Sequence, residues 1–164
     1  MSSTTPSRRL RAARSASLAT VLLALFVGTV IATSASGFHG TPLARGTTAG
    51  AVQFNVGDIK VQTKSQVDIA HATVTIDPLG SSGWHSHPGV VLVTVASGTV
   101  TFYNADCSFN TYSAGASFIE SNGTTGLARN ESAATPAVLY VAYIVPAGAP
   151  ALRIDQPNAG CAQS

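Results

Sequence analysis

The chain has 164 residues, enough for one domain of ordinary size once an N-terminal leader is set aside. Its residues are 45% hydrophobic and only 10% charged, which excludes a disordered chain and suits an all-β domain. From Phe38 onward five basic residues face seven acidic ones, so the positive charge of the whole chain belongs to its first residues and no nucleic-acid partner is expected.

The first residues have the layout of a secretory signal. Four arginines precede an uncharged apolar run over residues 18–32, and small residues follow at 33–37. We therefore expect residues 1–37 to be a signal peptide or a membrane anchor. The run is about 15 residues long and a spanning helix needs about 20, so cleavage is favoured over a retained anchor. The protein is expected to be secreted or extracytoplasmic, with membrane contact only through this leader.

Residues 38–51 are rich in Gly, Thr, Ala and Pro and are interpreted as a linker. Alternating apolar and polar residues then predict strands over 52–56, 59–63 and 67–76. Gly57 and Asp58 form the first turn, and residues 77–80 are expected to form the second.

Six more short strands are predicted after residue 89, and no segment of this part has a helical period beyond about one turn. They cover residues 90–96, 99–103, 111–112, 116–120, 127–130 and 137–145. Many short strands at close spacing predict a single all-β domain over residues 52–164, built as a sandwich or a small barrel.

The two cysteines, Cys107 and Cys161, are predicted to form a disulfide because the domain is expected in an oxidising compartment. The bridge would close a loop of roughly 55 residues, for which the chain-entropy estimate is about 4 kcal/mol. A metal site at these cysteines is disfavoured, because neither lies in a CxxC motif or a Cys/His cluster.

Candidate metal ligands lie between Gly80 and Gly89. His85 and His87 are two residues apart on a short extended segment, so their imidazoles project from the same face. Trp84 points the opposite way and is expected to pack in the interior. The alternative for the two histidines is that they face a barrel mouth and bind water or backbone groups.

These residues resemble the first motif of the cupin family, G(X)5HXH(X)3,4E(X)6G. Gly80, His85, His87 and Gly98 fit the motif, with one residue fewer than usual between Gly80 and His85. The glutamate position falls on Val91, so the carboxylate ligand of the family is missing there.

The second cupin motif, G(X)5PXG(X)2H(X)3N, is matched without a gap at Gly115, Gly123 and Asn130. Ser121 stands at the proline position and Gly126 at the histidine position. The resemblance covers roughly residues 67–145 and implies a small double-stranded β-barrel, or jelly roll, that holds a divalent ion such as Fe, Mn, Ni, Cu or Zn. Only two of the four family ligands are kept.

Two other residues are candidates to complete the ligand set. Glu120 ends the strand that leads into the second motif, and His71 precedes the first motif by one strand length. If both point inward, three imidazoles and one carboxylate would surround the ion.

Two functions from different classes follow. The first is an exported cupin that binds a divalent metal through His85 and His87 and binds or acts on a small molecule, with no reason in the sequence to choose dioxygenase, isomerase or hydrolase chemistry. The second is a non-catalytic barrel that binds a small molecule or a protein after losing the metal site. Strands over residues 52–61 are open to pairing with a second copy, and a homodimer and a monomer are equally compatible with them.

Overall fold

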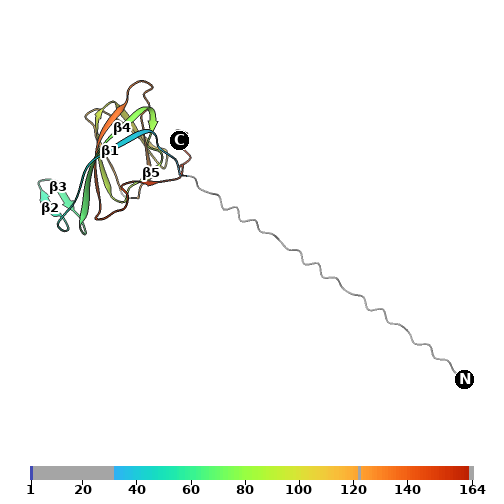
Figure 1. Ribbon diagram of the computed structural model, residues 1–164, viewed down its shortest axis with the longest axis horizontal. Coiled ribbons are helices and arrows are strands. Elements are labelled where there is room, and N and C mark those ends of the chain that lie inside the picture. Colours follow the sequence, from blue (N-terminus) through green and yellow to red (C-terminus); the bar gives the residue numbers. More distant parts are fainter. Residues whose placement is uncertain (2–31, 122, 163–164) are drawn as a thin grey trace.

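The computed structural model describes Met1 and residues 32–121 and 123–162. Most of the expected leader therefore lies outside the described residues. Those residues form twelve strands and no helix (Figure 1). The strands are β1 (Ser36–Thr47), β2 (Gln53–Val56), β3 (Ile59–Gln62), β4 (Val67–Ser81), β5 (His85–Ser86), β6 (Val90–Ser97), β7 (Thr99–Asn104), β8 (Phe109–Ser113), β9 (Ser117–Glu120), β10 (Gly126–Arg129), β11 (Ala137–Pro146) and β12 (Ile154–Asp155).

Eight of these strands form a jelly-roll barrel. One sheet has the order β4-β11-β6-β9, and the other has the order β5-β10-β7-β8. A single pair, Arg129 with Ser81, joins the two sheets at the end of β4. Strand β1 extends the first sheet beyond β4, and β12 extends the second beyond β5. The all-β jelly-roll barrel predicted from the sequence is confirmed by this strand order.

The barrel interior is filled by one apolar cluster that both sheets supply. In β6 the alternation is complete: Val91, Val93 and Val95 are buried, whereas Leu92 and Thr94 are exposed. A strand with this pattern buries one face only, because successive side chains point to opposite sides. This alternation of burial therefore fixes which β6 residues line the cavity described below.

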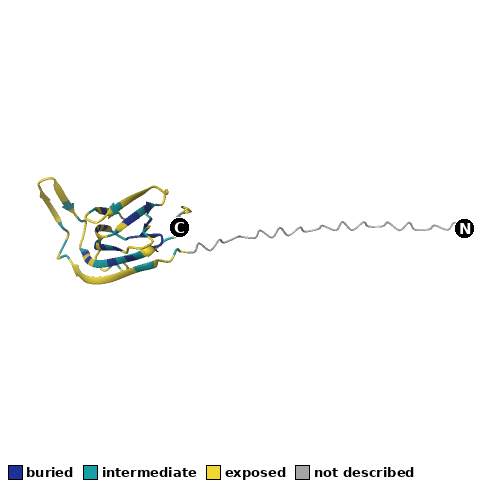
Figure 2. Cartoon of the chain, turned by 90° about the horizontal axis from the view of Figure 1, so that it is seen from above, coloured by how far each residue is buried: buried dark blue, intermediate teal, exposed yellow. Residues whose placement is uncertain are grey.

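The expectation of a linker over residues 38–51 is wrong for residues 38–47, which lie in β1 and pair with β4 along its length. Nearly all of the β1 side chains are exposed, so the strand has no apolar alternation that a sequence could reveal (Figure 2). Its position is held by backbone pairing and by Asp68, a buried carboxylate that accepts hydrogen bonds from Thr47 and Arg45 at 2.6 Å. These bonds, that from Thr47 first, lower the pKa of Asp68.

The turn expected at residues 77–80 is also absent, because those residues remain within β4. The chain bends there with Leu79 at a φ of 60° and continues to Ser81. The predicted strands at residues 52–56 and 59–63 are present as the β2–β3 hairpin, which turns at Gly57 and Asp58. The hairpin stands away from the barrel in both overall views (Figures 1 and 2).

The predicted disulfide between Cys107 and Cys161 is present. Cys161 is buried in a second, smaller core with Trp84, Tyr103 and Leu127. Trp84 packs there as expected and is 1% exposed. The bridge therefore fastens the C-terminal segment to the sheet that carries β5. Among the described residues no helix is long and apolar enough to cross a membrane.

Candidate metal centre

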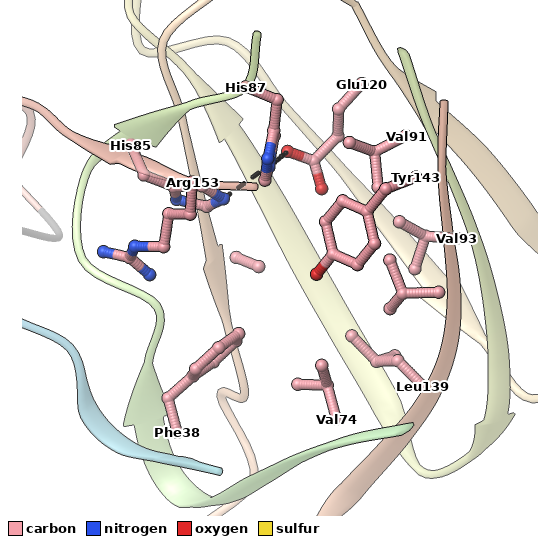
Figure 3. Close-up of a pocket in the computed structure, with 12 residues that line it drawn as sticks. Phe38, Val74, His85, His87, Val91, Val93, Glu120, Leu139, Tyr143 and Arg153 are labelled. Atoms are coloured by element: carbon pink, nitrogen blue, oxygen red, sulfur yellow. Dashed lines mark ion pairs between the residues drawn. The ribbon is translucent and has the colours of Figure 1, made fainter. Parts of the chain in front are cut away.

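His85 lies in β5, and His87 is the first residue after that strand. Both residues are buried, with 4% and 5% of their surface exposed. Their ring centroids are 4.9 Å apart with the ring planes nearly perpendicular. The shared face predicted from the i, i+2 spacing is therefore present. The two rings project into the mouth of the barrel (Figure 3).

Backbone carbonyls hold both imidazoles by their Nδ1 atoms. The Nδ1 of His85 lies 2.9 Å from the Gly83 carbonyl oxygen, and the Nδ1 of His87 lies 2.6 Å from that of Leu152. A carbonyl only accepts, so each Nδ1 carries the proton and donates it. Each Nε2 then presents its lone pair to the cavity, which is the arrangement that orients metal-binding histidines.

Glu120, at the end of β9, supplies the carboxylate. Its Oε2 lies 3.3 Å from the Nε2 of His87 and 3.6 Å from the Nε2 of His85, and the residue is 9% exposed. In the pairing of β6 with β9, Glu120 lies directly opposite Val91, the residue at the glutamate position of the family motif. The carboxylate thus comes from the neighbouring strand and reaches the same end of the barrel.

At the histidine position of the second motif, Gly126, no other residue of the described part of the chain supplies the missing ligand. Gly126 pairs with His85, so a side chain there would start beside the site. The ring of Phe102 occupies that space: a Cβ built on Gly126 would lie 2.1 Å from the Phe102 Cζ. Phe102 packs in turn on Phe118, with ring centroids 5.4 Å apart. A third imidazole, as a fourth ligand, has no room here unless Phe102 is replaced.

Both printed separations between Glu120 and the histidines fit a shared divalent ion. One ligand atom from each of His85, His87 and Glu120 lies within 4.8 Å of the others. Ligands about 2.1 Å from a shared ion are about 3.0 to 3.6 Å apart at octahedral to trigonal angles, which matches the two nitrogen-to-oxygen distances. Two imidazoles and one carboxylate with further positions open are a known set for transition metals.

The charge states of the site follow from burial. Burial lowers the pKa of His85 to about 4, against the opposing effect of the Glu120 charge, so the ring is neutral near pH 7. Burial and then the Glu120 charge raise the pKa of Tyr143 to about 12, so its hydroxyl keeps its proton. Neutral imidazoles are the form that binds a metal.

The cavity between these groups is small and mainly apolar, with a volume of about 40 Å³. By the space one water needs, this is room for an ion and two or three small ligand atoms. Phe38, Arg153 and Tyr143 lie in its wall, and the Tyr143 hydroxyl points into it (Figure 3). Tyr143 pairs with Val91 from the side opposite Glu120, so Val91 lies between the two polar residues.

Phe38, Tyr143 and Arg153 were not predicted as site residues from the sequence. Tyr143 continues the inward alternation of the 137–145 strand, a signal that identifies the face but not the partner. Phe38 lies in a segment interpreted as linker, and Arg153 follows two prolines with no strand pattern. The C-terminal segment reaches the site because β12 pairs with β5 and the Gln156 side chain donates to the Ser86 hydroxyl.

His71 does not reach the metal centre, which corrects the expectation of a third imidazole. It is exposed on β4, between the buried residues Ala70 and Val74, and pairs with Ala44 and Ala142. The inward residues of β4 have even numbers, so His71 faces outward. Of the two added candidates, only Glu120 joins the histidines.

No protein-family model matches the chain, and no curated protein matches it. Solved structures do resemble it. An uncharacterised conserved protein with a double-stranded β-helix domain from Klebsiella pneumoniae is 19% identical over 55% of this chain and 76% of its own, with a TM-score of 0.47. An oxalate oxidase is 20% identical over half of each chain, with a TM-score of 0.41. An RmlC-like cupin from Shewanella frigidimarina is 17% identical over 49% of this chain and 68% of its own, with a TM-score of 0.42.

The strand order carries the fold assignment, because the two four-stranded sheets follow the jelly-roll order and both motif histidines lie at the barrel mouth. By its strand order, the described part of the chain is a small single-domain jelly-roll barrel. At identities near 20%, the activities of these structures are not transferred to this chain.

Proposed function

We propose that this protein is an exported metal-dependent cupin that holds one divalent cation on His85, His87 and Glu120 and acts on a small oxygen-bearing molecule. One observation carries the proposal: two imidazoles, each fixed through Nδ1 by a backbone carbonyl, direct Nε2 toward the same buried carboxylate oxygen. A buried Glu120 without a compensating charge would be costly, and an ion supplies that charge.

Each residue of the cavity has a role in this proposal. The cation, which would be Fe, Mn, Ni, Cu or Zn, acts as a Lewis acid toward a bound oxygen. Tyr143 keeps its proton, and its hydroxyl points into the cavity, where it would donate a hydrogen bond to a bound molecule (Figure 3). Arg153 places a cation at the rim, where it is held by Asp155 at 2.8 Å and lies over the Phe38 ring at 5.9 Å. The valines of β6 exclude water from the inner wall.

Export is part of the proposal. The arginine-rich leader with its apolar run supports it, and so does the bridge between Cys107 and Cys161, since disulfides persist in oxidising compartments. In such a location the barrel would receive its metal outside the cytoplasm or during export.

One observation favours the second candidate function, a binding barrel without metal. The histidine position holds Gly126 and the Phe102 ring fills its space, so one family ligand is absent. In that case His85, His87 and Glu120 would form a buried polar cluster beside a small-molecule cavity.

Metal analysis separates the two functions. The exported protein is purified without a polyhistidine tag or chelator, and bound metal is measured for the wild type and for the His85→Ala, His87→Ala double variant. His71→Ala is the matched control, because it removes an exposed imidazole outside the site. We expect close to one ion per chain in the wild type and control and almost none in the double variant. Metal far below one per chain that added Zn²⁺ or Mn²⁺ does not restore would contradict the proposal.

A further inference from the structure

A second hollow adjoins the metal cavity along β1 and β4. Its volume is about 460 Å³, against about 40 Å³ for the metal cavity. Both have Phe38, Val74 and Tyr143 in their walls, so these three side chains form the border between them. A hollow of this size accommodates a small organic molecule, whereas the metal cavity alone accommodates only a few atoms.

The hollow exists because the residues that face it are small. Gly40 pairs with Val74 and Pro42 pairs with Ala72, and Ala70 also lies in the wall, so this part of the sheet carries only small residues. A Cβ built on Gly40 would have no heavy atom of another residue within 4 Å. Gly40 also lacks a positive φ, so a larger residue there would extend into open space without backbone strain.

Apart from His71 and Arg45 the wall of the hollow is apolar, and Arg45 is already neutralised. Arg45 is bound by the Asp68 carboxylate and by the Ala149 carbonyl. Leu43 and Leu152 contribute aliphatic surface, and Phe38 and Tyr143 contribute rings at the metal end. An apolar body therefore suits the hollow, and a charged one does not.

The charge of the metal centre limits the charge of the ligand group that binds next to the metal. With a divalent ion, two neutral imidazoles and the Glu120 carboxylate, the centre has a net charge of +1. Arg153 adds no free charge, because Asp155 pairs with it. One monoanionic group neutralises the centre, whereas a dianion would leave an uncompensated negative charge in a buried site.

We propose, on the basis of the metal function above, that the substrates are small amphipathic monocarboxylates. The carboxylate lies at the metal between Tyr143 and Arg153, and the apolar body extends past Phe38 into the hollow between β1 and β4. Gly40 and its small neighbours set the length of the body that fits.

Calorimetric titration of the Zn²⁺-loaded protein tests this assignment, after one Zn²⁺ per chain has been verified. The probes are acetate, butanoate and hexanoate, with hexanamide as the uncharged match of the longest acid. Each buried methylene should raise affinity about fourfold, so hexanoate should bind roughly 200-fold more tightly than acetate if the whole chain is buried. Hexanamide should bind much more weakly than hexanoate.

Two variants of the same strand locate the effect. Gly40→Leu should fill the hollow and remove the dependence on chain length while acetate binding stays unchanged. Gly46→Leu is the control, because Gly46 also lies in β1 with open space around its Cβ but is outside the wall of the hollow. An affinity independent of chain length, or an unaltered series in Gly40→Leu, would overturn the substrate assignment while the metal function stands. Failure to load Zn²⁺ would instead overturn the metal function and, with it, this assignment.

Discussion

Two positions at the barrel mouth depart from the family motifs, and they depart in different ways. At Val91 the carboxylate is absent, but Glu120 on the paired strand supplies one directly opposite. At Gly126 the imidazole is absent, and the ring of Phe102 fills the space that it would need. A ligand can therefore come from the paired strand, because residues that pair directly point to the same side of the sheet. A ligand whose space is taken by a packed ring is lost.

The largest expected effect is at the relocated carboxylate. Glu120→Gln keeps the size of the side chain but removes its charge, so metal affinity should fall by about 100-fold or more. Competition with a fluorescent chelator measures the loss, and circular dichroism verifies that the barrel is folded. Unchanged affinity would show that Glu120 is not a ligand.

Exchanging Val91 and Glu120 tests whether either position of the pair can supply the carboxylate. The double variant Val91→Glu, Glu120→Val returns the carboxylate to the motif position and keeps the same atoms at the barrel mouth. We expect metal affinity within about tenfold of the wild type, because ligand loss costs more than a shift of a hydrogen-bonded neighbour. Affinity as low as that of Glu120→Gln would mean that the two positions are not equivalent.

At Gly126, where the Phe102 ring fills the space, we predict a gain in metal affinity. Replacing Phe102 by Ala should empty the space beside Gly126, and adding Gly126→His should place a third imidazole near the ion. We expect the double variant to bind Zn²⁺ about tenfold more tightly than Phe102→Ala alone. The same chelator competition measures this, with Phe102→Ala as the reference for any loss of packing. Equal affinities would contradict the view that Phe102 excludes a ligand.

Cys161→Ser should have a smaller effect on the metal. The bridge to Cys107 fastens the segment whose Leu152 carbonyl holds His87, so metal affinity should fall several-fold as that segment loosens. Stability should fall by about 2 to 4 kcal/mol, measured by denaturant unfolding. A melt that is the same for the variant and the wild type would mean that the bridge does not restrain the fold.

The smallest effect on the metal is expected for Gly126→Ala. The added methyl group would overlap the Phe102 ring, so the free energy of unfolding should fall by about 1 to 3 kcal/mol while metal affinity stays the same. Combining it with Phe102→Leu should restore part of the stability. If Gly126→Ala is as stable as the wild type, the ring does not occupy that space.

Local patterns in the sequence predicted much of this structure. The β-branched run over residues 90–96 predicted strand β6, and the i, i+2 spacing placed His85 and His87 on one face. The two cysteines form the disulfide that their number and setting indicated. Each of these inferences depends on residues near one another in the chain or on the only pairing available.

The remaining features depend on register between distant strands. Whether Glu120 faces the histidines is decided by its pairing with Val91, and the direction of His71 is decided by the parity of β4. Strand β1 is held by backbone bonds and by Asp68, with no apolar pattern of its own. Arg153 reaches the site because β12 pairs with β5. A strand of two residues is too short to be predicted from a sequence pattern.

Anomalous diffraction from crystals of the untagged exported protein tests the central claim most directly. We predict one strong peak per chain within about 2.3 Å of the Nε2 atoms of His85 and His87 and of a Glu120 oxygen, with an absorption edge that identifies the metal. Crystals soaked in Zn²⁺ or Mn²⁺ that show no peak there, with Glu120 bonded only to the two imidazoles and water, would contradict the account.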